Sequence, residues 1–389
     1  MSISEVLNNT LKGRGHKLWA EIDLAALVRN YRRIEKLSRG AKVIPVIKAD
    51  AYGHGAIECM HALEDAGADF FAVATIAEAI ELREACGYKS KILILGYTLD
   101  CDVDLLERYN ITQTVFSLEY ARALDDACAR RGVGVLDVHI KLDTGMNRLG
   151  FDTKDAKNTA ELINSVGSLS HLSVKGMFTH FACADEYGSG LTDIQRKRYD
   201  EVKRELGKNK PEICHICNSA GIIRQEIPAY DAVRAGIILY GHMPSGEFDL
   251  KDFETPMSLK ARVAHVHTLK PGDSVSYGAT FTADREMKIA TLPVGYADGF
   301  IRAYSKSSVR INGKDCPIVG RICMDQCMVD VSGADVKQGD IAVIFDSREK
   351  VEELAKMSGT ITYEVLCLIG KRVPRVYVNK TPKCGAKGE

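Results

Sequence analysis

Short apolar runs alternate with amphipathic segments from about residue 42 to residue 240, and this alternation constrains the fold more than any other feature of the chain. The amphipathic segments are rich in Ala, Glu, Arg and Leu and are long enough to form helices that connect parallel strands. There are eight apolar runs, the number that closes a (β/α)8 barrel. They are Val43–Lys48, Phe70–Ala74, Ile92–Gly96, Thr112–Ser117, Leu136–Leu142, Val174–His180, Ile213–Cys217 and Ala232–Gly236.

A doubly wound open sheet would show the same alternation of strands and helices. However, no G-x-G-x-x-G motif follows the first apolar run, and polar side chains occur at nearly every strand end instead of at one crevice. The sequence therefore predicts an α/β fold with a TIM-type barrel over residues 13–247.

The pattern changes after about residue 247 to short β-branched runs separated by turns. Asn312-Gly313 between two such runs is a strong hairpin signal, and one short helix is expected at Val351–Ser358. The sequence thus predicts a mostly β domain over residues 248–389. Its expected strands are Arg262–Leu269, Lys288–Val294, Val309–Ile311, Met328–Val331 and Ile341–Phe345.

Composition excludes several classes of partner. The chain has 389 residues, 46% of them hydrophobic, and Lys+Arg 52 balances Asp+Glu 52, which gives no electrostatic reason to bind nucleic acid or an acidic membrane. It has no apolar stretch of about 20 residues and no signal peptide, so we expect a cytoplasmic protein with a small-molecule partner. Among the 12 cysteines, Cys214 and Cys217 form a C-x-x-C and Cys323 and Cys327 a C-x-x-x-C, but no second pair at zinc spacing accompanies either, so no metal site is expected. Residues 1–16 and 379–389 are expected to be loosely ordered.

Reactive side chains gather at the predicted strand ends, where barrels of this kind form their active sites. On the fifth strand, Val138, Ile140 and Leu142 alternate with polar residues, so the polar face points into the lumen. Lys141 on that face needs a partner, and an ion pair with Asp137 or Asp143 is one explanation. The strand-end residues are Lys48, Lys141, Asp143, Arg148, His180, His215, Asn218, Ser219 and Arg234.

Six segments of the chain, taken together, are similar to those of the alanine racemases, enzymes that depend on pyridoxal 5'-phosphate (PLP). The resemblance covers about residues 17–378 and keeps the order of the motifs. The segments read VIKADAYGHG from Val46, KLDTGMNRLG from Lys141, VSYG from Val275, GYADGF from Gly295, VGRICMDQ from Val319 and ITYEV from Ile361.

The resemblance implies that Lys48 bonds to the cofactor and that Lys48 and Tyr277 are the two bases, each on one face of the substrate. It implies that Arg234 faces the pyridine nitrogen, donating a hydrogen bond without releasing its proton. The catalytic network would include His180, Arg234 and His215. The remaining implied cofactor contacts are Tyr52, Asn218, Ser219, Gly236, Ile237 and Tyr363, and the implied substrate contacts are Arg148, Met324 and Tyr296.

The resemblance further implies a homodimer in which Tyr277 and Met324 enter the partner's barrel, and a carbamylated lysine at Lys141 that holds Arg148. The implied activity is racemisation of alanine, which would supply D-alanine for peptidoglycan. Bulk at Tyr363 and Tyr296 favours alanine over serine, although a serine or broad-specificity racemase stays open. A fold-related PLP decarboxylase, which would place an acid opposite the pyridine nitrogen, and a non-catalytic PLP-binding protein stay open as well.

Overall fold

The computed structural model describes residues 15–249 and 251–379, and most of the two terminal segments expected to be loosely ordered lie outside these ranges. The chain forms two compact units. Of the described residues, the barrel unit comprises Val28–Ala51 and Ala56–Glu254, and the β unit comprises 15–27, Tyr52–Gly55 and 255–379. The predicted boundary at residue 247 stays a prediction.

The barrel unit contains eight parallel strands in the order β2-β10-β9-β8-β6-β5-β4-β3. A parallel bridge between Val46, just after β2, and Ala72 of β3 joins the two ends of this strand order. The bridge confirms the predicted barrel. A two-residue strand, β7 (Phe151–Asp152), pairs beside β6. The barrel strands are β2 (Lys42–Pro45), β3 (Phe70–Val73), β4 (Lys91–Ile94), β5 (Thr112–Val115), β6 (Leu136–Asp143), β8 (Leu172–Phe178), β9 (Ile213–His215) and β10 (Ala232–Ala235).

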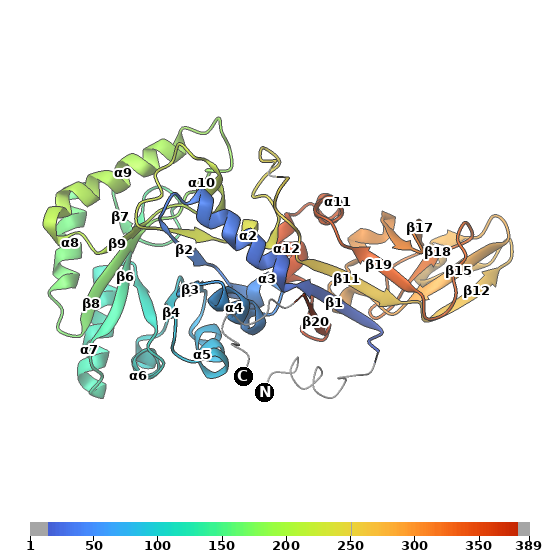
Figure 1. Cartoon of the computed structure of the whole chain (residues 1–389), viewed down its shortest axis with the longest axis horizontal. Helices are drawn as coiled ribbons and strands as arrows, with labels where there is room; N and C mark the ends of the chain where they lie inside the picture. Colours follow the sequence, from blue (N-terminus) through green and yellow to red (C-terminus); the bar gives the residue numbers. More distant parts are fainter. Residues whose placement is uncertain (1–14, 250, 380–389) are drawn as a thin grey trace, which may run out of the picture. The chain divides into compact units, whose positions relative to one another are not determined.

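Helices connect the strands and lie around the outside of the barrel (Figure 1). Their ends follow local chemistry: Thr75 and Glu78 form a capping box at the start of α5, and Gly132 in the left-handed region ends α7. These helices are α2 (Leu24–Leu37), α4 (Ala56–Asp65), α5 (Ile76–Cys86), α6 (Val103–Arg108), α7 (Leu118–Arg131), α8 (Ala156–Gly167), α9 (Leu191–Leu206) and α10 (Ser219–Ile223).

The β unit is built on a nine-stranded sheet in the order β12-β15-β18-β17-β16-β19-β11-β1-β20. The predicted hairpin is present, since Asn312 and Gly313, both at positive φ, connect β16 to β17. The strands are β1 (Leu18–Asp23), β11 (Met257–Arg262), β12 (His265–Leu269), β15 (Met287–Leu292), β16 (Ser308–Ile311), β17 (Lys314–Val319), β18 (Cys327–Asp330), β19 (Ile341–Phe345) and β20 (Arg375–Val378), with a small pair β13 (Ser274–Val275) and β14 (Phe281–Thr282).

Several elements of the β unit were absent from the sequence prediction, among them β1, β11, β20, the short pair β13 and β14 and the short helix α12 (Thr362–Cys367). In addition, the run predicted at Arg262–Leu269 contains β12, and only its first residue, Arg262, belongs to β11. The predicted helix at Val351–Ser358 is the end of α11 (Arg348–Ser358). Strand β1 pairs with β11 and β20, which lie more than two hundred residues later, so no local turn signal reveals it.

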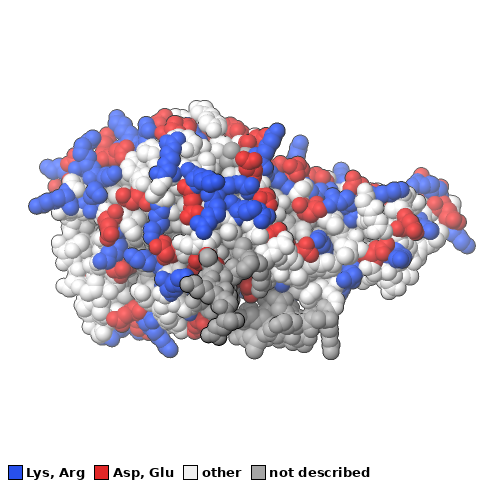
Figure 2. All heavy atoms as spheres, viewed as in Figure 1, with Lys and Arg blue, Asp and Glu red and all other residues white. Residues whose placement is uncertain are grey.

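The surface carries both signs of charge. On the face in Figure 2, Lys and Arg side chains are interspersed with Asp and Glu side chains, and broad areas of uncharged residues lie between them. Among the described residues, no helix has the length and apolar character needed to cross a membrane.

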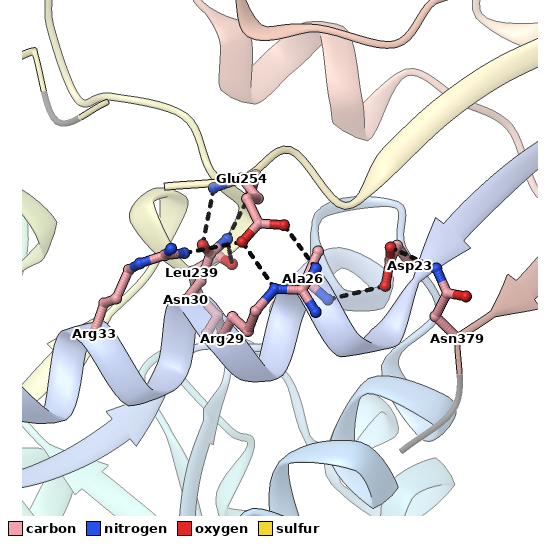
Figure 3. A network of polar contacts seen from close by, with 8 residues as sticks. All are labelled: Asp23, Ala26, Arg29, Asn30, Arg33, Leu239, Glu254 and Asn379. Carbon is pink, nitrogen blue, oxygen red and sulfur yellow. Dashed lines mark hydrogen bonds and ion pairs between the residues drawn. The ribbon is translucent and has the colours of Figure 1, made fainter. Parts of the chain in front are cut away.

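Helix α2 is joined to the end of the barrel unit by a polar network around Glu254 (Figure 3). The Glu254 carboxylate accepts hydrogen bonds from Arg29 at 2.8 and 2.6 Å and from Arg33 at 3.1 Å. The buried amide of Asn30 donates to the carbonyls of Leu239 and Glu254. The network therefore fastens the last segment of the barrel chain to its first helix.

Candidate active site

Lys48 lies just beyond the carboxyl end of β2 and begins a left-handed turn. Ala49, Asp50, Ala51 and Tyr52 all have φ between 51° and 53°, a conformation that residues with a Cβ adopt rarely. The Asp50 carboxylate accepts the N–H of Ala56 at 2.8 Å and so supports the turn. Strained backbone of this kind persists where the surroundings fix it, and it often marks a functional site.

Glu78 at the start of α5 holds this turn against the next strand. One carboxylate oxygen accepts the N–H of Ala49 at 2.7 Å, and the other accepts the N–H of Ala74 at 2.7 Å. Glu78 was not among the predicted site residues. Its only sequence signal was the capping pair with Thr75, which predicts a helix start and not a support for Lys48.

Arg234 on β10 is buried at the centre of the strand-end cluster. Its Nη1 donates to Nδ1 of His215 at 2.9 Å, and its Nη2 donates to the carbonyl of Thr179 at 2.6 Å. The same Nη2 lies 3.4 Å from Nδ1 of His180. Burial lowers the pKa of Arg234 to about 10, so the guanidinium stays charged at neutral pH. The predicted members His180, His215 and Arg234 therefore form one network.

The histidines of this network are neutral. Burial, followed by the charge of Arg234, lowers the pKa of His215 and His180 well below the usual range. A third histidine, His139 on β6, lies 3.0 Å from His215, and burial together with Lys91 and Arg234 lowers its pKa to about 3. Arg234 is therefore a buried cation next to neutral imidazole acceptors.

Lys141 is also buried on the lumen face of β6, as its alternation predicted. Its amine donates to the carbonyl of Leu142 at 2.9 Å and lies 5.5 Å from the centre of the Phe178 ring. Burial, and after it the charge of Arg234, lowers the pKa of Lys141 to about 7. Within the part of the chain that the structure describes, no ion pair joins it to Asp137, which pairs with Lys175, or to Asp143. Arg148, in the exposed loop after β6, is close enough for its charge to act on Lys141.

The segments after β9 and β10 meet through Ser219, whose hydroxyl accepts the N–H of Gly236 at 3.1 Å. Because a hydroxyl also carries one donor, Ser219 has a proton to offer a ligand. Asn218 caps α10, accepting the N–H of Gly221 at 3.0 Å, so its side chain has a structural role here. Ile237 is buried at the start of a four-residue 3-10 helix.

The β unit presents Tyr277 and Met324 together on a hollow of about 710 Å³. Tyr277 is 72% exposed and Met324 is 53% exposed, so both side chains are available for contact with another molecule. The turn before Tyr277 is fixed, since Ser276 has φ 68° and donates through its hydroxyl to the Arg321 carbonyl at 2.7 Å.

Tyr296 begins a short 3-10 helix of the β unit, and Tyr363 lies on α12 of the same unit. The N–H of Tyr296 donates to the carbonyl of Cys323 at 3.0 Å, which ties its turn to the Met324 segment. Tyr363 on α12 packs against Tyr52, with ring centroids 6.1 Å apart, and burial raises the pKa of Tyr52 well above its usual range. No group of three metal-ligating side chains occurs among the residues described.

Two family profiles match the chain. The alanine racemase N-terminal domain matches residues 22–244, and the alanine racemase C-terminal domain matches residues 256–377. The chain is 44% identical over 371 residues to alanine racemase 1 of Clostridium acetobutylicum, covering 93% of this chain and 95% of the relative. It is 40% identical over 375 residues to alanine racemase of Methanococcus maripaludis, covering 94% of this chain and 99% of that relative.

Solved structures give the same result. Alanine racemase of Clostridium difficile superposes with a TM-score of 0.89 at 40% identity, covering 94% of this chain and 97% of that one. Alanine racemase of Acinetobacter baumannii superposes with a TM-score of 0.80 at 30% identity, covering 94% of this chain and 100% of that one.

Proposed function

The chain belongs to the alanine racemase family, and from this premise we propose that it interconverts L-alanine and D-alanine with PLP bound at the carboxyl ends of the barrel strands. The observation that carries the proposal is the state of Arg234. Its buried guanidinium donates hydrogen bonds to carbonyl oxygens and uncharged imidazoles, and it carries no acceptor atom of its own. An arginine in this state can hold a pyridine nitrogen by a hydrogen bond without protonating it, which disfavours a decarboxylase.

The donor set of the barrel fits PLP. Lys48 offers an amine for the aldehyde, Ser219 a hydroxyl proton for the phosphate and Arg234 a donor for the ring nitrogen. When bound, PLP draws electrons from Cα of the amino acid and makes its Cα–H acidic. We further assign to cofactor binding the residues Tyr52, Asn218, Gly236, Ile237 and Tyr363.

The proton transfers need one base on each face of Cα. We assign the D-alanine face to Lys48 and the L-alanine face to Tyr277 of the partner subunit. Neutral His180 accepts from Arg234 through Nδ1, so its proton is on Nε2, and we propose that it donates this proton to the tyrosine oxygen. His215 orients Arg234 from the other side.

The shared site follows from the assignment of Tyr277. We propose a homodimer in which Tyr277, Met324 and Tyr296 complete the partner's barrel, and the exposure of these three side chains supports it. Arg148 is assigned to the substrate carboxylate. We also propose that Lys141 is carbamylated, because a pKa of about 7 leaves much of the amine uncharged and able to attack carbon dioxide, forming an N–C bond and releasing a proton.

The test is to incubate PLP-saturated protein with L-alanine in deuterated water, following the Cα proton by NMR and the enantiomers by chiral chromatography. Deuterium entry with drift to equal amounts of D- and L-alanine is expected, and Lys48→Ala should abolish both. A parallel reaction with L-serine measures the selectivity for alanine over serine. One hydroxyl group typically contributes about 1 to 3 kcal/mol of discrimination between two substrates. Release of carbon dioxide would point to a decarboxylase, and binding of PLP without exchange would point to a non-catalytic protein.

A further inference from the structure

His139 is a buried imidazole that the proposed mechanism does not use. It projects from β6 into the barrel, and its Nδ1 lies 3.0 Å from Nε2 of His215 on β9. His215 in turn accepts a hydrogen bond from Arg234 on β10 through Nδ1. Three side chains from three strands therefore form a line that ends on the guanidinium.

The direction of every hydrogen bond in this line is determined by Arg234, because a guanidinium has donors and no acceptor. Nδ1 of His215 must accept, so the proton of neutral His215 is on Nε2. That proton faces Nδ1 of His139, which must accept it. Each imidazole is thus restricted to the tautomer with its proton on Nε2.

Phe178 and His139 restrict His215 in different ways. The ring of Phe178 stacks on that of His215, with centroids 4.8 Å apart and planes at 8°, and so fixes the plane of the imidazole. Stacking alone permits the ring to flip by half a turn, which would exchange Nδ1 with a carbon atom. The acceptor on His139 disfavours that flip, because the buried N–H of His215 would lose its partner.

Gly176 makes room for His139. The two residues are register neighbours on β8 and β6, next to an irregularity between Val138 and His139. A Cβ at Gly176 would lie 2.3 to 2.5 Å from three atoms of the His139 ring, so a larger residue would displace the imidazole. Glycine inside a strand often marks such a close approach.

We propose that His139 is a positioning residue for Arg234, acting through His215, and that Gly176 is required by the place His139 occupies. The effect of His139 on the reaction rests on the proposed function, in which Arg234 faces the ring nitrogen of PLP. Loosening Arg234 would let water protonate that nitrogen. A larger share of turnovers would then end with the amino group on the cofactor and alanine released as pyruvate.

The first test reads the tautomers directly by nitrogen NMR of the full-length protein labelled with ¹⁵N-histidine, with and without PLP. His215→Gln identifies the His215 signals. We expect His215 protonated at Nε2 in the wild type and in His139→Gln, whose amide oxygen can accept, and mixed tautomers in His139→Leu. A wild-type His215 protonated at Nδ1, or a His139→Leu spectrum with the His215 tautomer unchanged, would overturn the proposal.

A double-mutant cycle tests the role of Gly176. Gly176→Ala should lower the unfolding midpoint in the wild type and lower it much less in a His139→Ala background, where the clash is absent. Equal effects in both backgrounds would contradict the pairing.

The second test measures pyruvate formed per racemisation turnover in the PLP-saturated enzyme. This ratio does not depend on the fraction of folded protein, so a purely structural role would leave it unchanged. We expect His139→Leu to raise it about tenfold, the factor one ordinary hydrogen bond is worth, and His139→Gln to return it toward wild type. An unchanged ratio in an active His139→Leu enzyme would refute the positioning role. Absence of racemisation in the wild type would instead refute the proposed function, and the tautomer measurement would then decide alone.

Discussion

Glu78 accepts the backbone N–H of Ala49 at 2.7 Å, one residue after Lys48, which lies just beyond the carboxyl end of β2. The same carboxylate accepts the N–H of Ala74 at the end of the neighbouring strand. A left-handed turn of residues with a Cβ is unfavourable by itself, so its geometry depends on fixed contacts of this kind.

We predict that Glu78→Ala lowers the free energy of unfolding by about 1 to 3 kcal/mol, because backbone donors at two strand ends lose their partner. It should also speed the loss of PLP, since Lys48 would no longer be held in place. Urea unfolding and the rate of PLP dissociation measure the two effects. Glu161→Ala, an exposed carboxylate on α8, is the control and should change neither. Wild-type stability and PLP retention in Glu78→Ala would contradict the role.

Gly320 and Gly313 offer a matched pair for testing the Tyr277 turn. Both have positive φ, 71° and 77°, but a Cβ at Gly320 would lie 2.8 Å from Cβ of Ser276, whereas nothing lies within 4 Å of one at Gly313. In each Ala variant, backbone strain should lower the free energy of unfolding by about 1 to 2 kcal/mol. Gly320→Ala should in addition lower kcat up to about a hundredfold, because it shifts Tyr277. Equal activities of the two variants would show that this turn does not position the tyrosine.

The network around Glu254 predicts a loss of stability in acid (Figure 3). Hydrogen bonds from Arg29, followed by those from Arg33, lower the pKa of Glu254 to about 2. A depressed carboxyl pKa stabilises the fold above the unfolded value of about 4.3, and this contribution disappears as the pH falls toward 2. After discounting for solvent screening, we expect the free energy of unfolding of Glu254→Gln to be about 1 kcal/mol below that of the wild type at pH 6. Denaturant titrations at several pH values measure the difference, and a gap that persists at pH 2 would contradict this cause.

The barrel could be predicted from the sequence because its strands and helices are local patterns that follow one another along the chain. The polar face of β6 was predicted in the same way, and Lys141 is buried there. The alternation of LWAEID at β1 was available too, but its partner strands β11 and β20 are distant in sequence, so pattern alone did not assign it to the β sheet.

The supports of the site were harder to predict than the reactive residues, because they depend on neighbours across strands. Gly176 inside the run Val174–His180 was a usable signal for close approach, yet nothing local shows that His139 lies against it. Asn218 beside Ser219 fits both a helix cap and a ligand contact: its side-chain oxygen caps α10, and its contact with the cofactor stays a prediction.

Carbamylation of Lys141 should depend on pH. Because burial and Arg234 lower its pKa to about 7, the uncharged amine that reacts with carbon dioxide becomes abundant as the pH rises through that value. Carbon NMR with ¹³C-bicarbonate should therefore show a carbamate signal that grows between pH 6 and pH 8 and is missing from Lys141→Ala. A wild-type spectrum without that signal at pH 8 would show an unmodified amine.

Arg372 links the two segments that carry Tyr296 and Met324. Its Nε donates to the buried carboxylate of Asp298 at 2.6 Å, and its Nη2 donates to Asp325 at 2.7 Å. Asp298 also accepts the N–H of Gly295 at 2.9 Å, so the cation holds the first segment through Asp298 and the second through Asp325.

Two substitutions separate stability from positioning at Arg372. Arg372→Met leaves the Asp298 carboxylate buried without its cation and should lower the free energy of unfolding by about 3 kcal/mol. Arg372→Lys keeps a charge but cannot bridge two carboxylates in a fixed geometry. Its free energy of unfolding should therefore stay within about 1 kcal/mol of the wild-type value. Its KM for alanine should rise severalfold, and its selectivity for alanine over serine should fall. Lys371→Met, an exposed neighbour, controls for loss of charge. If Arg372→Lys kept the wild-type KM and selectivity, the bridge would stabilise the β unit without shaping the substrate site.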